Sequence, residues 1–353
     1  MKRIAILVFT VQMTLFAQVS DREIANMFML GFYGTKADSN TQVCKDLQRG
    51  LGGVILFSKR PDNRKLYKNF SSAQSLKNLN SELKNCNRSV LIAVDQEGGV
   101  VQRVKFRQSY PKAVTISMMG AQKAKQYYRT MAQELYSLGV NFNLAPIADL
   151  ALNPKNRVIV GLGRSYGANW KKVVAYDKIF IDAMHSYRVA TSLKHFPGHG
   201  SSLGDTHKGF VDVTNYWQPQ ELYPYYKLKN TTDTVMVAHV FNRKLDPKYP
   251  ASLSRAVVTK KLRQEIGFRG VVISDDLQMG AIAKHYSLRD RVKLSINAGV
   301  DILLFANQLN KKSIVSLNTL IKSVRSLLQS GAVSEATIKA ANVRINRLKA
   351  KYQ

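Results

Sequence analysis

The stretch VLIAVDQEGG, residues 90–99, sets the pattern from which the fold can be argued. Five apolar residues come first, three of them β-branched, and Asp95, Gln96, Glu97 and two glycines follow at once. A short apolar run of this kind is typical of a strand that is buried on both faces. Polar residues that could take part in binding or catalysis therefore stand where such a strand would end.

The same pattern recurs along the chain and gives eight candidate strands. They are Ala25–Gly34, Gly53–Phe57, Val90–Val94, Phe142–Ile147, Thr191–Lys194, Val235–Val240, Val271–Ser274 and Asp301–Phe305. Segments with helical spacing lie between them, among them Ala121–Leu138, Trp170–Tyr187, Arg255–Ile266 and Leu288–Ala298. Strands that alternate with helices favour a parallel sheet.

Eight such units in a chain of 353 residues predict an α/β fold, a (β/α)8 TIM-like barrel built as a single domain. The main alternative is a doubly wound open sheet. No GxGxxG motif follows the first candidate strand and no GxxxxGK[ST] motif occurs, which disfavours a nucleotide-binding sheet.

Five of the candidate strands end in charged or imidazole side chains. These are Asp95, Asp149, Lys194 with His195, His239, and Asp275 with Asp276. In a barrel the carboxyl ends of the strands carry the active site, so these residues predict one polar site at one end of the barrel.

Asp275 and Asp276 are adjacent, and neighbouring residues of a regular strand point to opposite faces. We therefore expect them to have different roles and not to form an acid/base pair. One of the two would face the barrel mouth, while the other would either cap the following helix or meet the surrounding shell. For Asp276 the structural alternative is an N-cap ahead of Leu277–Ala283.

A second constellation is LKHFPGHGSSLGDTHKGF, residues 193–210, which leaves a strand end and enters a glycine-rich loop. Asp205 and His207 are separated by one residue, so a bend in the loop can bring carboxylate and imidazole together. A carboxylate next to an imidazole stabilises its protonated form, which favours proton donation. Metal binding and a purely structural loop are the alternatives, but no HxH or HExxH spacing supports a metal site.

These motifs resemble the single-domain bacterial β-N-acetylglucosaminidases of glycoside hydrolase family 3. The matching segments are VDQEGGVVQR (94–103), LAPIADL (144–150), GRSYG (163–167), KHFPGHGSSLGDTH (194–207), VMVAHV (235–240) and VVISDDLQM (271–279). The resemblance implies a barrel catalytic domain over residues 18–353.

The resemblance also implies a role for each matching residue. Asp275 would be the nucleophile that forms a glycosyl-enzyme intermediate, with His207 as general acid/base and Asp205 as its partner. The substrate-binding residues would be Asp95, Arg103, Arg164, Lys194 and His195. A nucleophilic carboxylate implies retention at the anomeric carbon, and neither a metal nor a cofactor is expected. One departure is Val100, which stands where the family often has a basic residue.

The N-terminus has the pattern of a secretory signal peptide over residues 1–17. Lys2 and Arg3 precede an uncharged apolar run, Ile4–Ala17, that is short for a membrane span. The cleavage site is uncertain because Leu15, at position −3, is not small. We expect export, to the periplasm, with no membrane span after cleavage; if the run is a buried element instead, the protein would be cytoplasmic.

Two cysteines, Cys44 and Cys86, are present. Export would permit a disulfide between them, but two free thiols are equally compatible with the sequence.

Lys and Arg number 53 against 23 Asp and Glu, which gives a formal net charge of +30. Such a balance suggests nucleic-acid binding. However, the basic stretches 59–88 and 308–353 show no interleaved aromatic residues and no nucleic-acid-binding motif. The second stretch predicts an amphipathic helix that includes Ile338, Val343, Ile345 and Leu348. We expect no specific nucleic-acid partner, and a basic surface that can attract anionic cell-wall polymers.

Together these features predict an exo-acting retaining β-N-acetylglucosaminidase (a β-N-acetylhexosaminidase). Its substrates would be peptidoglycan fragments (muropeptides) or related glycans with terminal N-acetylglucosamine. The alternatives are a family 3 β-glucosidase and a basic wall-binding protein without catalysis.

Overall fold

The computed structural model describes residues 18–309 and 313–353, so the predicted signal peptide lies outside the described residues. Eight parallel strands form one sheet in the order β10-β1-β2-β3-β6-β7-β8-β9. A parallel bridge between Ile273 and Ile302 joins the two ends of this order, and the sheet curls into a nearly closed barrel. The predicted TIM-like barrel is therefore confirmed.

The barrel strands are short. They are β1 (Phe28–Gly31), β2 (Gly53–Ile55), β3 (Leu91–Val94), β6 (Phe142–Asn143), β7 (Ala190–Phe196), β8 (Thr234–Val237), β9 (Val271–Ser274) and β10 (Leu303–Phe305). A small antiparallel hairpin, β4 (Gln96–Gly98) and β5 (Val101–Gln102), follows β3.

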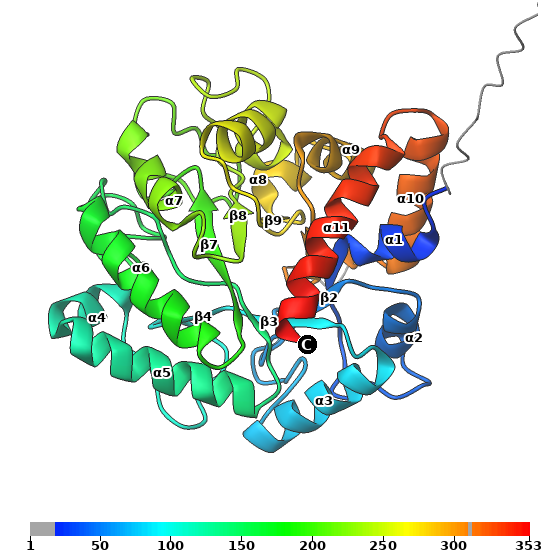
Figure 1. Cartoon of the computed structure of the whole chain (residues 1–353), viewed down its shortest axis with the longest axis horizontal. Helices are drawn as coiled ribbons and strands as arrows, with labels where there is room; N and C mark the ends of the chain where they lie inside the picture. The colour runs from blue at the N-terminus through cyan, green and yellow to red at the C-terminus, as the bar shows by residue number, and fades with distance from the viewer. Residues whose placement is uncertain (1–17, 310–312) are drawn as a thin grey trace, which may run out of the picture.

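Helices surround the strands (Figure 1). They are α1 (Asp21–Asn26), α2 (Gln42–Gln48), α3 (Ala73–Cys86), α4 (Ala113–Met119), α5 (Ala121–Ser137), α6 (Trp170–His185), α7 (Tyr223–Leu228), α8 (Gly280–Ala283), α9 (Leu288–Ala298), α10 (Leu317–Gln329) and α11 (Glu335–Tyr352), with shorter or tighter turns at η1 (Pro219–Leu222) and η2 (Ala251–Leu253) and a π-helix, η3 (Ala256–Glu265). Among the described residues, no helix has the length and apolar character needed to cross a bilayer.

Every residue of the eight barrel strands is buried. This burial explains why the strands appear in the sequence as continuous apolar runs, since a parallel sheet is covered on both faces. The outer helices bury one stripe each. In α10, for example, Leu317, Leu320, Ile321 and Val324 recur at helical spacing and are all buried.

Several expectations about the elements need correction. The strands predicted at Phe142–Ile147 and Val235–Val240 end earlier, at Asn143 and Val237. The first candidate strand is shorter than predicted, because Ala25 and Asn26 complete α1 behind a Ser20 capping box. The predicted helix at Arg255–Ile266 is π-helical over Ala256–Glu265. Val343 of α11 is exposed, so it does not belong to the apolar stripe of that helix.

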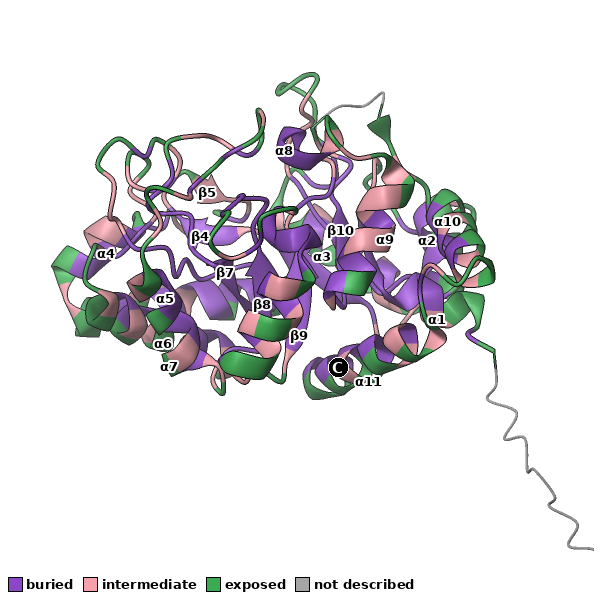
Figure 2. Cartoon of the chain, turned by 90° about the horizontal axis from the view of Figure 1, so that it is seen from above, coloured by how far each residue is buried: buried purple, intermediate pink, exposed green. Residues whose placement is uncertain are grey.

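Helix α11 covers the amino-terminal end of the barrel. Its side chains bind polar groups that directly precede three strands: Tyr352 donates to Asp233 at 2.6 Å, Lys349 donates to Asn26 at 2.6 Å, and Arg344 pairs with Asp301 at 2.7 Å. Figure 2 shows α11 on one side of the barrel and the segments with β4, β5 and α8 on the other. The carboxyl ends of the strands are thus left open for a site.

The structure joins Cys44 of α2 to Cys86 at the end of α3, with 5.3 Å between the Cα atoms. The bond ties two neighbouring outer helices together. For a separation of 42 residues, the chain-entropy account predicts about 4 kcal/mol of stabilisation.

Asp233 is the hub of the α11 interface. Its buried carboxylate accepts from His185 Nε2 at 2.6 Å, from Lys351 Nζ at 2.7 Å and from the Thr191 backbone N–H at 3.0 Å, besides Tyr352. Burial alone would raise the pKa of Asp233, but these hydrogen bonds and the charge of His185 hold it at about 2.

We predict that Asp233→Asn lowers the free energy of unfolding by about 2 kcal/mol at pH 7, because the buried carboxylate loses its charge-assisted hydrogen bonds to His185 and Lys351. A carboxyl with a lowered pKa stabilises the fold above its ordinary pKa, and that stabilisation is lost as the pH falls toward 2. The difference in the free energy of unfolding between the wild type and Asp233→Asn should therefore become smaller below pH 4. Denaturant unfolding at several pH values measures it.

Asp182→Asn is the matched control, because Asp182 forms an exposed pair with Lys178 on α6. Exposed pairs contribute about 1 kcal/mol or less, so this variant should change little. If the loss in free energy of unfolding caused by Asp233→Asn stays the same from pH 7 to pH 3, the ionised Asp233 carboxylate is not the source of the stabilisation.

Candidate active site

A cavity of about 350 Å³ opens at the carboxyl ends of the barrel strands. All eight site residues predicted from the sequence line it: Asp95, Arg103, Arg164, Lys194, His195, Asp205, His207 and Asp275. The cavity brings together segments that follow β3, β7 and β9, which are far apart in the sequence. Convergence of the strand ends thus produces the polar site that the sequence predicts.

Asp275 stands immediately after β9. The backbone N–H of Asp276 donates to its Oδ1 at 2.8 Å. Burial would raise the pKa of Asp275, but His239, His195 and His207 lie near enough to stabilise the charged form, and the pKa is about 2. Asp275 is therefore a carboxylate at any pH at which the protein would work.

Asp276 has a different role from its neighbour, but not the predicted capping role. Helix α8 begins at Gly280 with Met279 as its N-cap. The Asp276 carboxyl instead accepts the backbone N–H groups of Gln278 and of Ala306, just after β10. Burial raises its pKa to about 6. Both acids line the cavity. The regular strand ends at Ser274, so successive side chains no longer point to opposite faces at Asp275 and Asp276.

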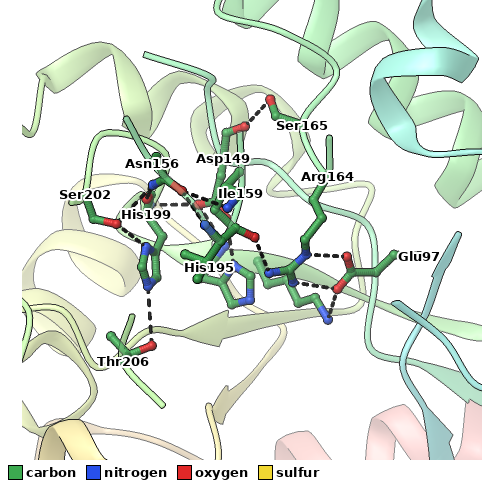
Figure 3. A network of polar contacts seen from close by, with 12 residues as sticks. Glu97, Asp149, Asn156, Ile159, Arg164, Ser165, His195, His199, Ser202 and Thr206 are labelled. Atoms are coloured by element: carbon green, nitrogen blue, oxygen red, sulfur yellow. Dashed lines mark hydrogen bonds and ion pairs between the residues drawn. The ribbon is translucent and has the colours of Figure 1, made fainter. Parts of the chain in front are cut away.

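A network of buried charges forms one wall of the cavity. Lys194 Nζ lies 2.8 Å from Glu97 and 3.1 Å from Asp95, and Arg164 forms a two-pronged pair with Glu97 at 2.8 Å for each bond. Arg103 contacts Asp95 at 3.4 Å. Figure 3 shows the pair of Arg164 with Glu97. Five charged side chains from three segments are thereby held at fixed positions.

These charges keep one another ionised. Burial would raise the pKa of Glu97, but Arg164 and Lys194 lower it far below the ordinary value. Burial would lower the pKa of Lys194, but Glu97 and Asp95 raise it above the ordinary value. The wall therefore offers cationic donors and carboxylate acceptors of the kind that hold hydroxyl and amide groups.

Asp149 fixes the orientation of His195. Its buried carboxylate lies 2.7 Å from His195 Nδ1 and accepts the backbone N–H groups of His195 and His199, at 3.2 and 2.8 Å (Figure 3). Burial would raise the pKa of Asp149, but the two histidines lower it. Because Nδ1 of His195 is taken, Nε2 is the ring nitrogen left for a ligand.

His239, the remaining histidine at a strand end, does not line the cavity. It is fully buried, with Nδ1 2.6 Å from Ser252 Oγ and Nε2 2.9 Å from the Asp276 carbonyl oxygen. Burial lowers its pKa. Its ring therefore supports the backbone beside Asp275.

Asp205 and His207 form the predicted pair on the loop after β7. Their side chains are joined at 2.9 Å between Oδ1 and Nδ1, and the His207 backbone N–H donates to the same oxygen at 3.0 Å. The Asp205 and His207 side chains are 27% and 58% exposed, whereas Lys194 and Glu97 of the charged wall are 3% and 5% exposed. Burial would raise the pKa of Asp205, but the His207 hydrogen bonds lower it. Nε2 of His207 is left to exchange a proton.

Several lining residues were not singled out from the sequence. Glu97 stood in the quoted motif without a role, His199 and Thr206 stood in the loop, and the apolar lining includes Phe57, Val158, Ile159, Leu162 and Met236. The apolar residues carry no sequence signal beyond hydrophobicity. Val100, the noted departure, is 53% exposed and does not line the cavity.

Within residues 18–309 and 313–353, no group of three or more His, Cys, Asp or Glu side chains could hold a metal ion.

Comparison with known proteins identifies the family. The family described as the glycosyl hydrolase family 3 N terminal domain matches residues 19–348. The chain is 32% identical over 294 residues to a beta-hexosaminidase of Xanthomonas oryzae pv. oryzae, which covers 79% of this chain and 83% of that protein. It is 33% identical over 276 residues to a beta-hexosaminidase of Haemophilus ducreyi, with 73% and 75% covered.

Solved structures agree. A glycoside hydrolase family 3 beta-N-acetylglucosaminidase from a Paenibacillus species superposes with a TM-score of 0.84 at 29% identity. The match covers 95% of this chain but 63% of that one, so this chain spans less than two thirds of the Paenibacillus enzyme. The beta-N-acetylhexosaminidase of Beutenbergia cavernae, at 24% identity and a TM-score of 0.83 over 95% of this chain and 100% of that one, shares the fold. The chain belongs to glycoside hydrolase family 3.

Proposed function

We propose that this chain is an exo-acting, retaining β-N-acetylglucosaminidase in which Asp275 is the nucleophile and His207, paired with Asp205, is the general acid/base. The observation that carries the proposal is the presence of an ionised strand-end carboxylate and a carboxylate-linked imidazole on the same small cavity. The β-hexosaminidase class follows from the family and from relatives named beta-hexosaminidase, which the chain matches over most of their length, and the β-N-acetylglucosaminidase structure points the same way.

In the first step, the Asp275 carboxylate would attack the anomeric carbon of the terminal sugar while the glycosidic bond breaks. His207 would give its proton to the leaving oxygen, so that the aglycone departs as a neutral alcohol. In the second step, His207 would take a proton from water, which attacks the same carbon and releases Asp275. Two displacements at one carbon give net retention.

The pKa of about 2 at Asp275 supports its role as a nucleophile, because the attacking group has to be ionised. The hydrogen bond between the Asp205 carboxylate and His207 Nδ1 supports the role of His207, because it holds Nδ1 and leaves Nε2 for the substrate. Asp205 would also stabilise the imidazolium that the acid step requires.

The charged wall supports binding of a polar sugar. Lys194, Arg164 and Arg103 would donate to hydroxyl or acetamido oxygens, Asp95 would accept from hydroxyl groups, and His195 would offer Nε2. A cavity of about 350 Å³ lies at the lower end of the range for ligand pockets, which suits a terminal sugar better than a long internal segment.

We further propose that the natural substrates are peptidoglycan fragments met after export. The motivation is the apolar run at Ile4–Ala17 and the net charge of +30, nearly all of which remains once Lys2 and Arg3 are removed. A strongly basic surface would concentrate the enzyme on anionic wall polymers.

Asp275→Ala should reduce the hydrolysis of 4-nitrophenyl N-acetyl-β-glucosaminide by about 10⁴-fold or more, since loss of a nucleophile removes the covalent route. Release of nitrophenol by the purified protein measures the rate, and thermal unfolding checks that the variant is folded. A wild type that cleaves only the corresponding glucoside, or a variant that keeps its rate, would contradict the proposal.

His207→Ala should affect substrates according to their leaving group. Cleavage of N,N′-diacetylchitobiose, whose leaving sugar alcohol needs a proton, should fall by about 10²-fold or more, while cleavage of the nitrophenyl substrate should fall much less. Steady-state kinetics with both substrates provide the comparison. Equal losses for both substrates would argue against the acid role.

Salt should separate surface attraction from catalysis. Raising the ionic strength from about 0.05 M to 0.5 M should release the protein from isolated cell-wall sacculi, because exposed charges are screened at these concentrations. Turnover of the neutral nitrophenyl substrate should change by less than about twofold. Equal salt sensitivity of binding and turnover would mean that the surface charge acts in the site.

A further inference from the structure

The loop that carries the acid/base pair is anchored at Thr206, the residue between Asp205 and His207. Thr206 is 3% exposed, although its two neighbours are partly exposed. Its carbonyl oxygen accepts the Ala281 backbone N–H at 3.0 Å, and the His207 carbonyl oxygen accepts the Gly280 N–H at 3.2 Å. A Cβ atom on Gly280 would lie 2.9 Å from the His207 carbonyl oxygen, so the close approach requires glycine there.

The other side of Thr206 faces His199. The Thr206 hydroxyl oxygen lies 3.4 Å from His199 Nε2, and the ring joins two parts of the same loop (Figure 3). His199 is 4% exposed, and its backbone N–H donates to Asp149 at 2.8 Å. The backbone of His199 is therefore fixed to Asp149, which also orients His195, and its ring contacts the acid/base segment.

The ring itself is oriented by a short chain of hydrogen bonds. His199 Nδ1 lies 2.7 Å from Ser202 Oγ, and Asn156 Nδ2 donates to that same oxygen at 3.0 Å. The Ser202 hydroxyl can donate to His199 Nδ1 at 2.7 Å or to the Gly204 carbonyl oxygen at 3.4 Å, and the shorter contact favours His199. The Nε2 hydrogen is then left to point at Thr206. Asn156 also accepts the Ile159 N–H at 2.7 Å and so joins the chain to the cavity wall.

This arrangement needs a neutral imidazole, with one donor and one acceptor nitrogen. Burial lowers the pKa of His199 to about 4, despite the nearby Asp149 carboxylate, so the neutral form dominates near pH 7. Both ring nitrogens have protein partners, which argues against a role for His199 as a proton donor to the substrate.

We propose that His199 is a positioning residue that holds Thr206, and through it the Asp205–His207 pair, at a fixed distance from Asp275 on the barrel. The inference rests on the proposed function, in which His207 protonates the leaving group. Catalytic efficiency depends steeply on the alignment of reacting groups, so a loop that shifts by about 1 Å would weaken proton transfer without removing the acid.

Thr206→Val and His199→Phe test the anchor, since each removes one side of the Thr206–His199 contact while keeping the side-chain shape. Each should lower kcat/KM for N,N′-diacetylchitobiose by about 10-fold and for the nitrophenyl substrate by less than about twofold. The double variant should lose no more than His199→Phe alone, because that change already breaks the Thr206–His199 contact as well as the His199–Ser202 hydrogen bond. Losses that multiply, or that are equal for the two substrates, would overturn the proposal.

Thr232→Val is the matched control. Thr232 is also buried and uses its hydroxyl, but it precedes β8 at the opposite end of the barrel. This variant should leave the ratio of the two rates unchanged. If His199→Phe does not fold, Thr206→Val alone carries the kinetic test.

Hydrogen exchange of residues 203–210 gives a readout that does not need the acid role. Exchange there should increase by about 10-fold in Thr206→Val, with no change in the barrel strands. Unchanged exchange would overturn the anchor itself. If exchange rises as expected while His207→Ala shows no dependence on the leaving group, the proposed function fails and the anchor stands.

Discussion

The parallel direction of all eight strands is the constraint on which the rest of this structure depends. Because neighbouring strands run the same way, every residue that directly follows a strand is brought to one rim. The barrel brings Asp95, Lys194 and Asp275 to one cavity. Each of them follows or ends a strand, and these strands are separated by roughly a hundred residues in the sequence. Helix α11 completes the arrangement, since it covers the other rim and leaves one open end.

Several buried carboxylates of this strongly basic chain are paired with cationic side chains. Glu97 binds Lys194 and Arg164, Asp301 binds Arg263 and Arg344, and Asp233 binds His185 and Lys351. Buried charges are tolerated when they are paired and hydrogen-bonded, so these acids are used inside the protein as counter-charges. The excess of bases is then left for the surface, which is consistent with a site whose own charges are nearly balanced.

The sequence predicted the barrel and the site unevenly, for physical reasons. Strands that are buried on both faces appear as apolar runs, and the residues after them are easy to name, so the fold and Asp95, Lys194, His195 and Asp275 could be predicted from the pattern, whereas Arg103 and Arg164 came from the family resemblance. The pairings between these residues could not be predicted, because the partners are far apart in the sequence. Glu97 and Arg164 are 67 residues apart, and Asp149 meets His195 across 46. For Asp276 the sequence left open a helix cap ahead of Leu277–Ala283 or a contact with the surrounding shell. The structure excludes the cap, since the Asp276 carboxyl accepts the backbone N–H of Ala306, which is far away in the sequence.

The proposed nucleophile and the proposed general acid/base are held in the structure in different ways. Asp275 directly follows a buried strand and accepts a hydrogen bond from the backbone N–H of Asp276, while His207 stands on a loop and its side chain is 58% exposed. A nucleophile has to meet one carbon in one direction, so a rigid mount suits it. An acid that serves different leaving groups, and then water, gains from a loop with some freedom. That freedom cannot be unlimited, and the buried Thr206 with the His199 ring beside it is where the structure restricts it.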